Sequence, residues 1–172
     1  MIDSEGYRAN VGIVIASGNG DVLWTKRVQQ GDSWQFPQGG VDRGESPEDA
    51  LYRELYEEVG LQAFQVEMIS QTKNWLRYQI PDHLIRKRQK PRCIGQKQRW
   101  FLMRLDASTD EIRFDCAEKP EFTEWRWVSY WYPTTSVVDF KQDVYRRALK
   151  ELAVPHAAMV DKFAKQKNVE QG

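Results

Sequence analysis

The sequence predicts one domain of the α/β (α+β) class, in which strands and helices share a chain of 172 residues. A chain of this length suffices for one domain with its own hydrophobic core. Several segments are apolar-rich and of strand length, namely residues 11–16, 22–27, 65–72, 98–105 and 124–128. Others repeat apolar residues at helical spacing, namely residues 47–59 and 136–152.

Local patterns place the strands and the loops between them. Gly18-Asn19-Gly20 separates the first two strands and favours a hairpin. The last predicted strand alternates Trp125, Arg126 and Trp127. Residues 81–91 are basic and lack clean periodicity, which predicts a loop.

Residues 47–59 carry the start and stop signals of a helix. Ser46 and Asp49 resemble a capping box, and Pro47 occupies the favoured first helical position. Gly60 is placed to end the helix as a C-terminal cap. We therefore expect a short helix with one apolar and one acidic face.

The acidic face is formed by Glu54, Glu57 and Glu58, which are spaced i, i+3 and i+4. Such spacing brings like charges together at a cost in stability, so a bound cation is the natural explanation. Hard cations such as Mg²⁺ take oxygen ligands, often with substrate phosphates. Gly39 and Gly40 would let the backbone approach an ion or phosphate closely. The alternative is a merely solvated acidic face.

The last predicted helix, residues 136–152, is expected to end before Pro155. Residues 155–172 are polar and read as a frayed tail, in which residues 157–163 have enough apolar positions for a further turn or two. We therefore predict a domain of residues 1–154 followed by a tail of residues 155–172.

The acidic helix and its flanks match a known family signature. The Nudix box has the form G-x5-E-x7-R-E-U-x-E-E-x-G-U, where U is a bulky aliphatic residue. The chain matches it at Gly39, Glu45, Arg53, Glu54, Leu55, Glu57, Glu58, Gly60 and Leu61. The chain thus resembles the Nudix hydrolase family. This resemblance implies a mixed β-sheet sandwiched between α-helices, and hydrolysis of a nucleoside diphosphate linked to another group.

Outside the box, the chain resembles one branch of that family, the bacterial RNA pyrophosphohydrolases. The matching stretches are residues 6–8, 10–15, 33–40, 74–78, 93–98, 125–133 and 140–147. The resemblance implies conversion of the 5′-triphosphate of mRNA to a 5′-monophosphate with release of pyrophosphate, which initiates mRNA decay. No pattern is recognised in residues 79–92 or in the tail, so no function carries over there.

The resemblance also suggests roles for individual residues. Glu54, Glu57 and Glu58, with Gly39, would hold two or three Mg²⁺ ions, for which Mn²⁺ could substitute, and would activate a water. Glu121 falls where the family places an extra carboxylate, as a metal ligand or general base, although a plain surface acid is equally consistent with the sequence.

Two other residues of the box are interpreted as supports of the catalytic carboxylates. Arg53 would orient them through charge-assisted hydrogen bonds, with Glu45 as its partner.

Candidate contacts to RNA are Arg8, Arg27, Phe140 and Lys141, which lie in the matching stretches. Arg27 ends a predicted strand and Phe140 begins a predicted helix. An arginine plane and an aromatic ring could clamp one base between them. Alternatively, Phe140 belongs to the apolar stripe of its helix and Arg27 is a surface charge.

A basic segment, residues 71–104, holds ten Lys and Arg against one acid, Asp82, in a chain with a formal net charge of zero. This asymmetry suits a polyanionic substrate. Trp75, Tyr78 and Trp100 punctuate the segment and favour base stacking, although they could equally be core residues of the flanking strands.

Two other functions remain open at this stage. The same box accepts dinucleoside polyphosphates such as Ap4A or Ap5A, and a non-catalytic RNA-binding Nudix module is the more distant alternative. We expect 5′-triphosphorylated RNA as the partner, no membrane partner, and a cytoplasmic location, because no leader or membrane span is recognised. A protein regulator cannot be inferred from the sequence. Cys93 and Cys116 are expected to stay unpaired.

Overall fold

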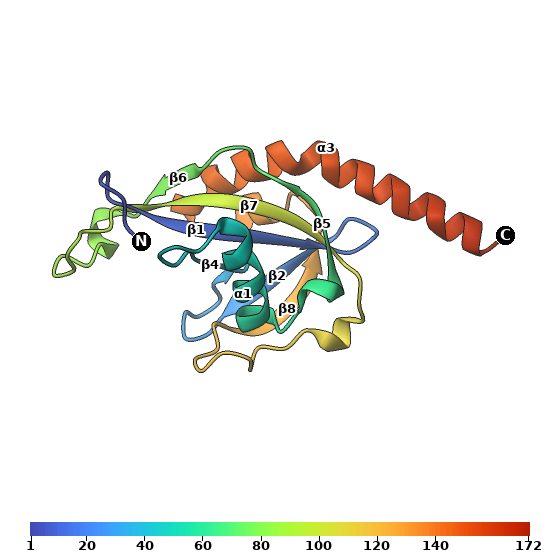
Figure 1. Ribbon diagram of the computed structural model, residues 1–172, viewed down its shortest axis with the longest axis horizontal. Coiled ribbons are helices and arrows are strands. Elements are labelled where there is room, and N and C mark those ends of the chain that lie inside the picture. The colour runs from blue at the N-terminus through green and yellow to red at the C-terminus, as the bar shows by residue number, and fades with distance from the viewer.

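A computed structural model describes all 172 residues, and its centre is a mixed β-sheet (Figure 1). The sheet runs in the order β3-β2-β1-β7-β5, and β4, β6 and β8 pair with β1, β7 and β2 respectively. Strands β1 and β7 run parallel from Tyr7↔Gly95 to Ala16↔Arg104, whereas the other pairs are antiparallel. The strands are β1 Tyr7–Ala16, β2 Val22–Arg27, β3 Trp34–Gln35, β4 Gln38–Gly40, β5 Val66–Gln71, β6 Leu76–Gln79, β7 Gly95–Leu105 and β8 Phe122–Val128.

The helices are α1 Pro47–Val59, α2 Pro133–Ser136 and α3 Asp139–Glu170, with short 3₁₀ turns η1 Ala63–Gln65, η2 Asp82–Leu84 and η3 Thr109–Glu111. Side chains of α1 and α3 cover opposite faces of the sheet, since they belong to two separate hydrophobic clusters. Alternate residues of β1 feed both clusters: Ile13 packs on the α1 side and Val14 on the α3 side. The expected sheet between helices is confirmed.

Helix α1 begins and ends where the sequence signals predict. The Ser46 hydroxyl accepts a hydrogen bond of 3.1 Å from the Asp49 amide, and Pro47 opens the helix. Gly60 adopts the left-handed conformation (φ 74°) and donates its amide to the Tyr56 carbonyl. Local chemistry alone therefore defines the element that carries the box carboxylates.

Several short elements were missed by the sequence reading, namely β3, β4, β6 and α2. Each has at most four residues, too few for a periodic signal. Trp100 is fully buried between Phe36 and Tyr145, so of the two interpretations that the sequence left open, base stacking and core packing, core packing is the one that holds. Its indole fills the core on the α3 side of the sheet.

The predicted end of the last helix was also wrong, because α3 continues through Pro155 to Glu170. Proline cannot donate the helical hydrogen bond, but contacts to the turn between β1 and β2 stabilise the helix beyond it. Met159 is buried, and the His156 ring lies 2.7 Å from the Gly20 carbonyl oxygen and stacks on Tyr130. Further along, α3 extends past the sheet (Figure 1). The division into residues 1–154 and 155–172 stays a prediction.

None of the helices combines the length and the apolar character needed to span a bilayer.

Candidate active site

One cleft collects most of the sequence-predicted site residues. It has a volume of about 660 Å³ and lies where β1, β2, β4, α1 and the start of α3 meet. Its acidic lining residues are Glu54, Glu58 and Glu121. Its basic lining residues are Arg8, Arg27, Arg86 and Lys141. The cleft therefore combines groups that suit cations with groups that suit anions.

Arg53 is the centre of the hydrogen-bond network behind the acidic wall. Its guanidinium donates to both carboxylate oxygens of Glu45, at 2.8 and 2.9 Å. It also donates to Glu54 at 2.7 Å and to the Gly40 carbonyl at 2.8 Å. This arrangement fixes α1 against the strand β4. Hydrogen bonding to Arg53 holds the pKa of Glu45 below its usual value, so Glu45 stays ionised as its counter-charge.

Glu54 and Glu58 are buried carboxylates, with only 9 % and 7 % of their surfaces exposed. Glu58 accepts a hydrogen bond of 3.0 Å from the Gln38 amide. Burial raises the pKa of Glu54, and it raises the pKa of Glu58 well above the usual value, with the charge of Glu54 adding to the effect. Two desolvated carboxylates side by side provide the donor set that a hard divalent cation would neutralise. The residues therefore fit a metal site.

Gly39 touches this pair directly. A Cβ at Gly39 would overlap the carboxylate of Glu54, whereas a Cβ at the next residue, Gly40, would meet nothing within 4 Å. Only glycine at position 39 lets the Glu54 carboxylate lie against the backbone of β4. The contact with Glu54 thus constrains the residue type at position 39 and not at position 40.

The third carboxylate of the predicted set, Glu57, is placed differently. It does not line the cleft and lies 3.4 Å from Arg53, with 43 % of its side chain exposed. No three His, Cys, Asp or Glu side chains stand together as a ready metal-ligand group. Glu121 is exposed and sits at the cleft edge, beside Glu58 and Arg27 in the lining. The ligand roles of Glu57 and Glu121 stay predictions.

The lining of the same cleft includes all four candidate RNA contacts. Arg8 comes from β1, Arg27 from the end of β2, and Phe140 and Lys141 from the first turn of α3. Phe140 is half-buried, with its ring 6.0 Å from that of Tyr78. The Arg8 and Arg27 guanidiniums form no ion pair or hydrogen bond with protein groups and can bind a ligand anion.

Lys141 is almost fully buried, which the sequence did not predict. Its ammonium donates to the Gln35 side chain at 3.0 Å and lies 3.5 Å from the Gln38 side-chain oxygen. Burial, together with the charge of Arg27, lowers its pKa to about 8. A buried lysine held only by neutral amides is available to a phosphate.

Sequence reasoning missed Gln38 as part of the site, and it named Tyr78 only as a base-stacking or core residue. Gln38 supports Glu58 through its backbone amide, and Tyr78 lies under Phe140 and Lys141. Both lie in stretches that match the RNA pyrophosphohydrolases, so the matching stretches were the available signal. The contact of Gln38 with Glu58 is made by the backbone amide, so the type of side chain at position 38 does not predict it.

The basic segment, residues 71–104, has fewer free cations for binding RNA than its charge suggests. Arg77 pairs with Glu5, Lys97 with Asp3 and Arg104 with Glu67, so acids elsewhere in the chain neutralise part of it. Three of its ten cations are therefore paired with acids, and Arg86 lines the cleft.

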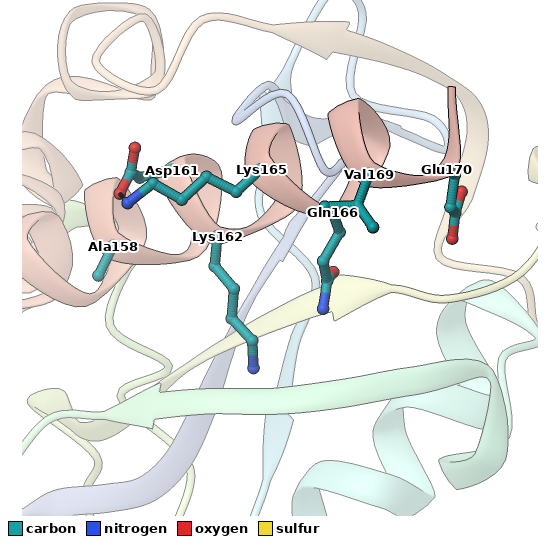
Figure 2. A pocket seen from close by; sticks show the side chains of 7 residues that line it. All are labelled: Ala158, Asp161, Lys162, Lys165, Gln166, Val169 and Glu170. Carbon is teal, nitrogen blue, oxygen red and sulfur yellow. Dashed lines mark ion pairs between the residues drawn. The ribbon is translucent and has the colours of Figure 1, made fainter. Parts of the chain in front are cut away.

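A second hollow lies along the C-terminal turns of α3. Figure 2 shows its lining side chains, among them Asp161 and Lys165, which form an ion pair along the helix. Every lining residue comes from α3 itself. A single helix face cannot enclose a small ligand, so the cleft described above remains the candidate active site.

Comparison with known proteins agrees with the fold. A family model described as the NUDIX domain matches residues 6–165. The chain therefore belongs to the Nudix hydrolase family. Enzymes of this family generally need divalent metal ions.

Relatives of similar length carry a more specific name. An RNA pyrophosphohydrolase of Psychrobacter sp. (strain PRwf-1) is 62% identical over 154 residues, which are 89% of this chain and 88% of the relative. One of Ectopseudomonas mendocina (strain ymp) is 59% identical over 153 residues, 89% of this chain and 96% of the relative.

Solved structures share the fold at lower identity. The E. coli dihydroneopterin triphosphate pyrophosphohydrolase has a TM-score of 0.65 at 24% identity, covering 82% of this chain and 95% of that one. A C. elegans Ap4A hydrolase has a TM-score of 0.59 at 18% identity, covering 81% of this chain and 93% of that one. At these identities the likeness concerns the fold alone.

Proposed function

We propose that this protein is an RNA pyrophosphohydrolase that converts the 5′-triphosphate end of mRNA to a 5′-monophosphate. Water adds to phosphorus, a phosphoanhydride bond breaks, and pyrophosphate leaves. The observation that carries the proposal is the cleft itself, in which buried Glu54 and Glu58 face Arg27, Phe140 and Lys141. The relatives that are 59–62% identical over most of the chain support the same reading. The reaction would take place in the cytoplasm and initiate mRNA decay.

The buried carboxylates would hold the metal ions that the family needs. We propose two or three Mg²⁺ ions, or Mn²⁺ in their place, on Glu54, Glu57, Glu58 and the Gly39 carbonyl. When bound, such ions supply charge stabilisation for phosphoryl oxygens and acidify a water molecule. Arg53 would act as a positioning residue, because its bonds to Glu45 and Glu54 fix the orientation of the acidic wall.

The remaining residues would act on the substrate and the proton. Glu121 at the cleft edge, as an exposed carboxylate, would accept the proton of the attacking water or serve as a further metal ligand. Arg8 and Lys141 would bind phosphate oxygens. Arg27 and Phe140 would hold one base between a guanidinium and an aromatic ring. Retention of every box carboxylate counts against a non-catalytic RNA-binding module.

Hydrolysis of dinucleoside polyphosphates is the second candidate, because such a substrate also joins a polyphosphate to a base. One assay separates the two: labelled 5′-triphosphate RNA, Ap5A and ATP are each incubated with the protein and Mg²⁺, and both products are followed. We expect pyrophosphate and 5′-monophosphate RNA, with kcat/KM far higher for RNA than for Ap5A or ATP. Higher turnover of Ap5A would overturn the proposal in favour of the second candidate.

A further inference from the structure

Beyond Arg8 the cleft opens into a smaller hollow, which we term the annex. It has a volume of about 240 Å³ and is lined by Arg8, Ile80, Leu84, Ile85, Arg86, Gln89, Cys93 and Gln96. Five of these residues, Arg8, Ile80, Leu84, Arg86 and Gln96, also line the main cleft, so the two spaces are continuous. Most of the annex wall comes from residues 80–93, the segment for which the sequence offered no function.

The segment forming this wall is anchored to the sheet. The Ile80 amide donates to the Ile94 carbonyl at 2.9 Å, and the Ile94 amide donates to the Gly6 carbonyl at 2.9 Å. The turn η2 follows Ile80. Ile85, the residue directly after this turn, is buried and fixes the turn against the body of the protein. The annex is therefore a structured part of the cleft wall.

Its lining combines apolar surface with free positive charge. Leu84 is 52 % exposed and lines both hollows, so its apolar surface is open to a ligand. The side chains of Arg8 and Arg86 make no ion pair and no hydrogen bond to protein groups, in contrast to Arg53 and Arg77. The side-chain amides of Gln89 and Gln96 add groups that can donate and accept hydrogen bonds. This combination suits a ligand with a flat apolar face, polar edges and an anionic group.

The pairing of β1 with its neighbouring strands shows where the annex lies relative to the buried carboxylates. Asn10 on β1 pairs with Gly40 beside the acidic wall, whereas Arg8, two residues earlier, pairs with Gln96 at the annex. Two residues of a strand span about 7 Å, roughly the spacing of successive nucleotides in an extended strand. A chain whose 5′ phosphates lie at Glu54 and Glu58 can therefore reach the annex through neighbouring nucleotides.

We propose that the annex binds one nucleotide of the RNA strand, separate from the base held at Arg27 and Phe140. Leu84 and Ile80 contact the base, and Arg86 and Arg8 bind the adjoining phosphate. The inference rests on the proposed function and adds a second nucleotide site to it. Its role is to make the enzyme prefer an oligonucleotide over a mononucleotide.

The test compares 5′-triphosphorylated oligonucleotides that grow by one nucleotide at a time. For the parent we expect both kcat/KM and affinity to rise by about 10-fold at the length that first fills the annex, as a stacked base with a phosphate contact would give. Arg86→Gln and Leu84→Ser should each remove most of that rise, and should lower kcat/KM far less for the shortest substrate than for the longer ones, because both residues also line the main cleft. Arg88→Gln is the matched control, because it removes the same charge from the same exposed loop outside both hollows.

Three outcomes would overturn the annex. The first is that Arg86→Gln lowers kcat/KM equally at every length, which would place Arg86 on the terminal phosphates. The second is that Arg86→Gln leaves kcat/KM unchanged at every length. The third is that Arg88→Gln has the same effect as Arg86→Gln, which would indicate a general charge effect. Failure of the proposed function looks different, because the parent would then release pyrophosphate from no oligonucleotide. In that case, affinities for the same oligonucleotides, measured with Mg²⁺ chelated, still test whether the annex binds a nucleotide.

Discussion

Gly39 on β4 and Glu54 on α1 are in such close contact that a Cβ at position 39 would overlap the Glu54 carboxylate where it now lies. The carboxylate of Glu54 lies against the backbone, where Arg53 holds one of its oxygens at 2.7 Å. The glycine is therefore a spatial requirement of the acidic wall, and its neighbour Gly40 is free of that requirement.

Gly39→Ala should lower kcat/KM on triphosphorylated RNA by about 10²-fold, because the added methyl displaces the Glu54 carboxylate, and a displacement of about 1 Å has such an effect. Gly40→Ala serves as the control and should stay within a few-fold of the parent. The values of kcat/KM for both variants and the parent are measured by steady-state kinetics at saturating Mg²⁺. Thermal unfolding verifies that both variants are folded. Equal losses in both variants would contradict the contact as the cause.

Glu54→Gln and Glu58→Gln should each lower kcat by at least about 10²-fold while RNA binding stays largely intact, since the change removes negative charge at nearly constant shape. Glu48→Gln, an exposed change on the first turn of the same helix, is the control. Isothermal titration with Mg²⁺ should show weaker binding only in the first two variants. Parental activity at saturating Mg²⁺ would refute the metal assignment.

Phe140→Ala should reduce kcat/KM for single-stranded triphosphorylated RNA by about 10-fold and scarcely alter the slow turnover of ATP, because only RNA presents a second base to the ring. A duplexed 5′ end should react poorly with the parent, since unstacking its base costs a few kcal/mol. Kinetics on the three substrates measures this. If the variant depresses ATP and RNA equally, Phe140 acts through packing on Tyr78 and not through a base.

The pKa of Lys141, lowered to about 8 by burial and by Arg27, predicts two effects of pH. Affinity for RNA should fall as pH rises through 8, because the ammonium that binds phosphate loses its proton. Stability should rise between pH 8 and the ordinary lysine value of 10.5, since in that window the unfolded chain keeps a proton that the folded protein has lost.

Lys141→Met tests both effects. Below pH 8 the folded parent keeps a buried charge, so the variant should be more stable at pH 7, by up to about 3 kcal/mol, yet should bind RNA more weakly. Its affinity should also lose the decline above pH 8. Urea unfolding and RNA titrations between pH 7 and pH 9.5 give the two readouts. A variant that is less stable and binds RNA as the parent does would contradict the assignment.

Met159→Ala should destabilise the protein by about 2 kcal/mol, because Met159 is buried beyond Pro155 and its truncation leaves a cavity. Val169→Ala, on the exposed last turn of the same helix, should be neutral within about 0.5 kcal/mol. Urea unfolding compares them. Identical stabilities would mean that the helix after Pro155 contributes nothing to folding.

Sequence alone determined α1 and the chemistry it carries. Ser46, Pro47 and Gly60 act on neighbouring residues through hydrogen bonds and allowed dihedral angles, so their effect can be read from order and spacing. The same holds for the Nudix box, whose spacing puts Glu54 and Glu58 on one side of a helix. Family membership and the mixed sheet between helices followed from that motif and are confirmed.

Only the tertiary structure decided how distant segments meet. Helix α3 continues past Pro155 because the turn at Gly18 and Gly20 receives its side chains, a contact over more than one hundred residues of sequence separation. Likewise, Arg8 and Arg86 approach each other because β1 and β7 pair in parallel and bring the segment between β6 and β7 beside the cleft. Such contacts arise from the burial of non-local surfaces, which no pattern along a single segment of chain encodes.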